Sequence, residues 1–209
     1  MRTAAVRAVT AHSLAPPRIA VSSGYGDVRV GRTPITNAQY GPFVRAGLAP
    51  EPPWWRDPRF DRTEQPVVGI TWHEAVAFGD WLSSLAGGRW RLPTSREWEL
   101  AARGGLVGAP TAWGDAVPPH EVPQGRLHGP WLVGRGTPNG YGLFDMGTIV
   151  HEWCSDVVED PRSPDGERRL SCGGSWRHHV RWSPPSARSS LPPGFRYSDY
   201  GFRLVLDMP

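Results

Sequence analysis

Two capped helices can be read from residues 66–105, which have the sequence PVVGITWHEAVAFGDWLSSLAGGRWRLPTSREWELAARGG. At the start of each, a threonine that can cap free backbone amides is followed three residues later by a glutamate able to reach back. These pairs are Thr71 with Glu74 and Thr94 with Glu97. Apolar residues then recur at helical spacing until a pair of glycines ends each segment. The stretch therefore predicts two short amphipathic helices that each bury one face.

The sequence on either side of this stretch predicts a single α+β domain. Thr36 and Gln39 form a third capping pair, at the start of a short helix that ends at Gly47. Later apolar runs, separated by Pro, Gly, Asn and Asp, predict strands at 131–133, 141–144, 150–153 and 202–206. Polar or proline-rich composition predicts surface loops at 159–169 and 183–194.

Composition limits the classes of protein that the chain can belong to. It has 209 residues with 25 Gly, 23 Pro and 11 Trp, which excludes a helical bundle and argues against disorder. We expect tryptophans 72, 81, 98 and 153 to lie in the core with their N–H groups hydrogen bonded. The basic residues are all arginine, and acids interspersed among them leave a net charge of +3, so we expect no nucleic-acid partner. No run is apolar enough for a membrane span, and two cysteines suit a reducing compartment. We therefore expect a cytoplasmic protein without a membrane partner.

Five blocks of sequence occur in a fixed order: GRTPITNAQYGPFVRAG (31–47), the quoted stretch (66–105), PNGYGLFDMGTIVHEWCSD (138–156), CGGSW (172–176) and YGFRLVL (200–206). Together they resemble the formylglycine-generating enzyme-like, or sulfatase-modifying factor, domain family. The resemblance implies a C-type-lectin-like α+β fold with short helices, a small twisted antiparallel sheet and many loops. It implies that this domain spans 31–209 and that residues 1–30 pack on it or lead into it.

The resemblance also implies a structural calcium site. Its ligands would be the side chains of Asp145 and Glu152 and the backbone oxygens of Thr148 and Val150, all hard oxygen donors. The family has Gly-Asn where this chain has Thr148-Ile149, and threonine tolerates a positive φ poorly. The alternative is that both carboxylates accept hydrogen bonds from turn amides.

The catalytic chemistry of the family is not expected in this chain. The resemblance implies copper(I) held by two cysteines shortly after GGS, where this sequence has His178 and Ser183. Copper(I) requires soft thiolates, so we expect no copper(I) and no formylglycine-generating activity. We expect Cys154 and Cys172 to be buried thiols on neighbouring strands.

A different metal centre would draw on other residues. If the chain is an enzyme, the candidate catalytic residues are His178, His179, His151 and Cys172. On a strand, the adjacent His178 and His179 would point to opposite faces, and the sequence shows no carboxylate at ligand spacing. We therefore do not expect iron.

The segment between GGSW and YGFRL predicts a recognition surface. It is rich in arginine and aromatic residues, the types that dominate binding hot spots, and its prolines limit the entropy lost on binding. The candidate binding residues are Arg177, His178, His179, Arg181, Trp182, Phe195, Tyr197, Asp199 and Tyr200.

Three functions follow from these features. The first is a monomeric, non-catalytic domain that binds a protein, peptide or small molecule through this surface. The second is a divergent metal-dependent oxidoreductase or maturation factor acting on a peptide or small molecule. The third is a variable protein of a diversity-generating retroelement, because such proteins display changeable residues on the same kind of frame.

Overall fold

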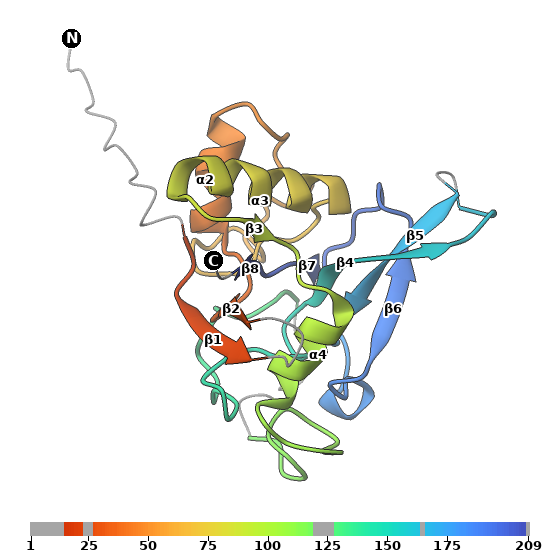
Figure 1. The fold of residues 1–209 in the computed structure, drawn as a ribbon. Helices are drawn as coiled ribbons and strands as arrows, with labels where there is room; N and C mark the ends of the chain where they lie inside the picture. Colours follow the sequence, from red (N-terminus) through yellow and green to blue (C-terminus); the bar gives the residue numbers. More distant parts are fainter. Residues whose placement is uncertain (1–14, 23–26, 119–127, 164–165, 208–209) are drawn as a thin grey trace.

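Three helices begin at the predicted capping boxes. The computed structural model describes residues 15–22, 27–118, 128–163 and 166–207, with α2 at Asn37–Arg45, α3 at Trp72–Ala86 and α4 at Ser95–Arg103 (Figure 1). In all three boxes the threonine oxygen accepts the backbone N–H of the residue three positions on. The side chain of that residue in turn accepts the threonine N–H. The helix predictions made from these pairs are confirmed.

Within the described residues, the strands form two four-stranded sheets. The first has the order β1-β2-β8-β3, with β1 at Arg18–Ser22, β2 at Asp27–Gly31, β8 at Val205–Asp207 and β3 at Trp90–Arg91. The second has the order β6-β5-β4-β7, with β6 at Arg188–Leu191, β5 at Glu167–Cys172, β4 at His151–Glu159 and β7 at Tyr200–Gly201. The predicted α+β class is confirmed, but the sheet is divided in two and β4 pairs with β7 in parallel. The domain boundary predicted after residue 30 falls within β2.

Several strand and loop predictions are wrong. Residues 131–133 and 141–144 lie outside any strand, in turns and irregular chain. In the second segment, Asn139 Oδ1 accepts the amides of Tyr141 and Leu143 and holds the chain in a tight loop. The predicted loop 183–194 contains β6, a polar edge strand without apolar alternation, and the predicted loop 159–169 already enters β5 at Glu167.

The helices and the two sheets share a core built on aromatic residues. Figure 1 shows α2 and α3 beside each other, and α4 lying against β4 and β5. Trp98 and Trp153 are fully buried, and their indole N–H groups donate to Glu152 Oε2 (2.7 Å) and Ile70 O (3.3 Å). Trp72 is half-buried and donates to Cys154 O, so the predicted core role with a bonded N–H is confirmed for these three rings. Trp81, the fourth predicted ring, is half-buried against the same core. Among the described residues, no helix is both long and apolar enough to cross a membrane.

A buried ion pair ties the first sheet to the second. Arg203, between β7 and β8, donates through Nε to Glu152 Oε2 (2.6 Å) and through Nη2 to Glu152 Oε1 (2.8 Å). Neither side chain is exposed to solvent. Because Glu152 is the second residue of β4, this pair fixes which face of the strand its neighbour His151 occupies.

Candidate functional site

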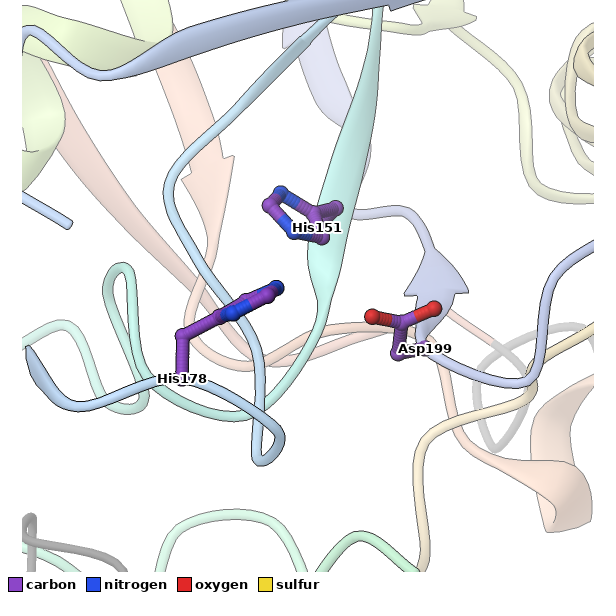
Figure 2. Close-up of side chains that lie close together, drawn as sticks. All are labelled: His151, His178 and Asp199. Carbon is purple, nitrogen blue, oxygen red and sulfur yellow. The ribbon is translucent and has the colours of Figure 1, made fainter. Parts of the chain in front are cut away.

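Three side chains that are far apart in the sequence meet at the first residue of β4. His151, His178 and Asp199 each offer a nitrogen or oxygen atom, and these atoms all lie within 4.8 Å of one another. Figure 2 shows the three side chains converging on one space. The parallel pairing of β4 with β7 explains part of this arrangement, since it sets His151 opposite Tyr200 and lets its N–H donate to Asp199 O (2.9 Å).

A tight turn carries the third member of the group. His178 N donates to Ser175 O (2.9 Å), which closes the turn, and Arg177 N donates to Ser175 Oγ (3.3 Å). The same Ser175 hydroxyl donates to Asp199 Oδ2 (2.9 Å). Ser175 therefore connects the turn that bears His178 to the carboxylate that lies beside it.

The two histidines differ in exposure and in charge. His178 is exposed, whereas His151 is half-buried, and burial lowers the pKa of His151 below its usual value of 6.5. The charge of His178 lowers that pKa further, while Asp199 and the backbone of Gly173 oppose the shift. His151 is therefore neutral at neutral pH, and its buried Nδ1 makes no hydrogen bond of normal geometry to the described residues.

A series of rings leads from the surface to this group. Tyr200 stacks on His151 with ring centroids 4.8 Å apart, and its hydroxyl shares a hydrogen bond with Ser189 Oγ (2.8 Å). The ring centroids of Tyr197 and Tyr200 are 5.7 Å apart, and those of Phe195 and Tyr197 are 6.4 Å apart. Phe195 and Tyr197 keep 42% and 39% of their surface exposed, so the outer end of the series is open to a ligand.

The structure brings together only part of the predicted catalytic set. His179 is exposed and does not belong to the group, and its Nδ1 accepts the N–H of Arg181 and caps the short helix η2 at Val180–Trp182. Cys172 lies on the other face of the sheet, where its Sγ is 3.6 Å from Cys154 Sγ and both thiols are buried. No carboxylate stands at ligand spacing in the sequence, but chain pairing brings Asp199 beside the histidines.

Only some of the predicted binding residues are exposed. Arg177 is exposed and lies over the ring of Trp176 at 5.2 Å, with Nη1 4.0 Å from Asp199 Oδ1. Arg181 is also exposed. Tyr200 and Asp199 are buried and support the surface from below, and the side chain of Trp182 falls outside the described residues.

The residues implied for calcium already have protein partners. Both oxygens of Glu152 accept from Arg203, and Asp145 Oδ2 accepts from Gly134 N (2.7 Å). The left-handed positions of this turn are taken by Asp145 (φ 60°) and Gly147 (φ 83°), so Thr148 is not forced into a positive φ. A calcium ion bound to Glu152 would lie against the Arg203 guanidinium, so Glu152 does not fit that role while the ion pair is intact. Calcium at the implied set is a prediction from the family resemblance alone, and the buried ion pair argues against it.

Comparison with known proteins gives the chain its family. Residues 22–208 match the family described as the sulfatase-modifying factor enzyme 1-like domain. The chain is 32% identical to the formylglycine-generating enzyme of Thermomonospora curvata, over 80% of this chain and 68% of that protein. It is 33% identical to the inactive C-alpha-formylglycine-generating enzyme 2 of Bos taurus, over 62% of this chain and 46% of that protein.

Solved structures agree on the fold. The structure of CarF superposes on this one with a TM-score of 0.75 at 22% identity. The superposition covers 94% of this chain and 100% of the CarF chain. Variable protein 1 of Treponema denticola superposes with a TM-score of 0.69 at 23% identity, over 87% of this chain and 85% of its own. At these identities the likeness concerns the fold alone, and it confirms the C-type-lectin-like frame expected from the sequence.

Proposed function

Because the chain belongs to the sulfatase-modifying factor enzyme 1-like domain family, we propose that it is a ligand-binding member rather than a copper-dependent oxidase. One observation carries this proposal. The two positions where the resemblance implies copper-binding thiols hold His178 and Ser183, and both cysteines of the chain are buried together elsewhere. Copper(I) has no thiolate pair to bind at this surface, while the fold that presents the surface is kept.

The exposed side chains around His178 suit an anionic ligand with an apolar part. We name Arg177, Phe195 and Tyr197 the rim. The Arg177 guanidinium is a planar donor that can bind a carboxylate with two hydrogen bonds, and the two rings offer apolar area at low entropy cost. A peptide or small molecule that carries a carboxylate next to an aromatic or aliphatic group fits this chemistry. A relative named inactive C-alpha-formylglycine-generating enzyme 2 supports the absence of the oxidase activity from part of the family.

Binding of simple probes tests the proposal. N-acetylated phenylalanine and tyrosine, with short carboxylate-ended peptides, can be titrated into the protein while chemical shifts of the rim residues are followed by NMR. We expect R177A and Y197A to weaken binding, each by about 5- to 30-fold, since one or two kcal/mol is typical of a contributing interface side chain.

The matched control for these variants is R56A, because Arg56 is also an exposed arginine with one carboxylate partner, Glu51, and lies outside the rim. Equal affinity of R177A, Y197A and the unchanged protein would contradict a ligand site at the rim. Conversion of a peptide cysteine to formylglycine in the presence of copper(I) would contradict the loss of the oxidase activity.

A second candidate function is supported by the meeting of His151, His178 and Asp199. Two imidazoles and a carboxylate form the kind of ligand set found in metal-dependent oxidoreductases. This candidate is a divergent oxidoreductase or maturation factor that acts on the peptide or small molecule bound at the rim. Unlike ligand binding at the rim, this function requires a metal ion. A measurement of metal binding therefore distinguishes the two candidate functions.

A further inference from the structure

We propose that His151, His178 and Asp199 bind a single divalent first-row transition-metal ion. The inference goes beyond ligand binding at the rim, which requires no metal, and it supplies the cofactor that the second candidate function needs. The three residues come from β4, from the turn that Ser175 closes, and from the residue before β7. None of them belongs to the positions that the family resemblance assigns to calcium.

The spacing of the three side chains is the first argument. Hydrogen bonds need donor–acceptor distances of about 2.7–3.2 Å. In the described part of the chain no hydrogen bond joins these three side chains directly to one another, since the bond from His151 N to Asp199 O is between backbone atoms. The three side chains nevertheless offer atoms that are all within 4.8 Å of one another. Around a metal with bonds of about 2.0–2.2 Å, two ligand atoms lie roughly 3–3.5 Å apart. A small inward movement of the exposed His178 therefore completes the coordination of one ion.

The burial and hydrogen-bond partners of His151 and Asp199 also favour a bound cation. The His151 ring is half-buried by the stacked Tyr200, and no hydrogen bond of normal geometry engages its buried Nδ1. Asp199 is buried and supplies the negative charge that a divalent ion requires. The Asp199 carboxylate already has the Ser175 hydroxyl and the Arg177 guanidinium as partners, so the His151 Nδ1 is the group that a cation between them would satisfy.

Ser175, which does not itself bind the ion, already orients the Asp199 carboxylate through a hydrogen bond. The Ser175 hydroxyl donates to Asp199 Oδ2. Oδ1, whose ion-pair contact with Arg177 Nη1 is a long 4.0 Å, is the oxygen that we assign to the ion. The same serine accepts the Arg177 amide, so the turn that carries His178 is fixed relative to the carboxylate. Metal sites commonly contain such outer partners, because they hold the ligands in the orientation that the metal needs. Ser175 is therefore a positioning residue.

The donor set selects the class of ion. Two imidazoles and one carboxylate suit Zn²⁺, Fe²⁺, Co²⁺ or Mn²⁺, whereas copper(I) prefers thiolates and calcium prefers an all-oxygen set. Three protein ligands also leave coordination positions free for water or for a bound ligand. Since His178 is exposed and Arg177 stands beside Asp199, a carboxylate held at the rim can reach those positions from solvent.

Cobalt(II) is the probe, because its visible absorption reports the number and kind of its ligands. The full chain is stripped with a chelator and titrated with Co²⁺, and Zn²⁺ binding is measured in parallel by calorimetry. We expect one equivalent of either ion to bind. Losing an outer partner typically lowers metal affinity about 10- to 100-fold, so S175A is expected in that range and H178A and D199N beyond it.

The adjacent His179 provides the matched control. It is an exposed histidine of the same turn region whose ring caps η2 instead of facing the site, so H179A should bind Co²⁺ like the unchanged protein. H178A removes an exposed side chain, and its melting temperature without metal should be unchanged, which separates lost binding from lost folding.

Two results would overturn the proposal. One is the failure of the unchanged protein to bind a stoichiometric ion. The other is an equal loss of affinity in H178A and H179A, which would indicate adventitious binding to surface histidines. Neither result bears on probe binding at the rim, because R177A and Y197A leave all three metal ligands in place.

Discussion

The buried pair of Arg203 and Glu152 yields a large and specific stability prediction. Replacing Arg203 with methionine leaves the Glu152 carboxylate buried with Trp98 Nε1 as its remaining donor. It also removes the donors that satisfy Gly31 O (2.9 Å) and Phe144 O (3.1 Å). Removing one partner of a buried ion pair costs about 3–5 kcal/mol, and the two freed carbonyls place R203M toward the upper end of that range.

Such a loss is measurable by thermal and urea unfolding. For a chain of this length, each kcal/mol corresponds to about 2–4 °C of melting temperature, so a loss of about 5 kcal/mol should make R203M melt roughly 10–20 °C lower. The control is R89M, since Arg89 makes an exposed pair with Asp207 that is expected to contribute about 0–1 kcal/mol. Far-UV circular dichroism follows both variants.

A double-mutant cycle then tests the cause. Replacing Arg203 and Glu152 together with apolar residues removes the uncompensated charge, so the double variant should be more stable than R203M alone. Additive losses in the cycle, or an R203M loss no larger than that of R89M, would refute the assignment of the pair as a coupled buried unit.

Three further predictions concern pH, thiols and calcium. Although burial raises it, hydrogen bonds from Arg91 hold the pKa of Glu97 below its ordinary 4.5. The stability that Glu97 contributes is therefore full above about pH 4.5 and is lost as pH falls through the folded-state pKa, and urea unfolding of E97Q should lack this part of the slope. Burial raises the pKa of Cys154 and also shields Cys172, so a chromogenic disulfide reagent should titrate both thiols only after unfolding; fast reaction of the native protein would contradict this. Because an arginine already neutralises Glu152, we expect calcium to leave the melting temperature unchanged in a chelator-treated sample, whereas a rise would support the implied calcium site.

Local sequence predicts the helices because their causes are local. A capping box involves residues three apart, so Thr36, Thr71 and Thr94 show the helix starts without any knowledge of the rest of the chain. The strands depend on distant partners, and Arg188–Leu191 has no apolar alternation to indicate that β5 will pair with it. Side-chain hydrogen bonds also override the pattern, as when Asn139 turns an apolar run into a loop.

For the same reason, the sequence predicts only part of the candidate site. His151 and His178 stand out as residue types, but the position of Asp199 depends on the parallel pairing of β4 with β7, which has two registered residue pairs and no signal of its own. Conversely, residues adjacent in the sequence do not always belong to the same site. The neighbours His178 and His179 separate, because one closes the turn at Ser175 and the other caps η2.

Two consecutive residues of β4 have different roles: Glu152 stabilises the domain, and His151 belongs to the candidate site. Alternation along a strand sends Glu152 into the core toward Arg203 and Trp98 and sends His151 to the face that carries Tyr200. A one-residue slip of β4 would exchange these environments, placing an unpaired carboxylate under Tyr200 and an imidazole beside the Arg203 guanidinium. The ion pair penalises that slip by several kcal/mol, so the same contact that stabilises the domain also keeps His151 within reach of His178 and Asp199.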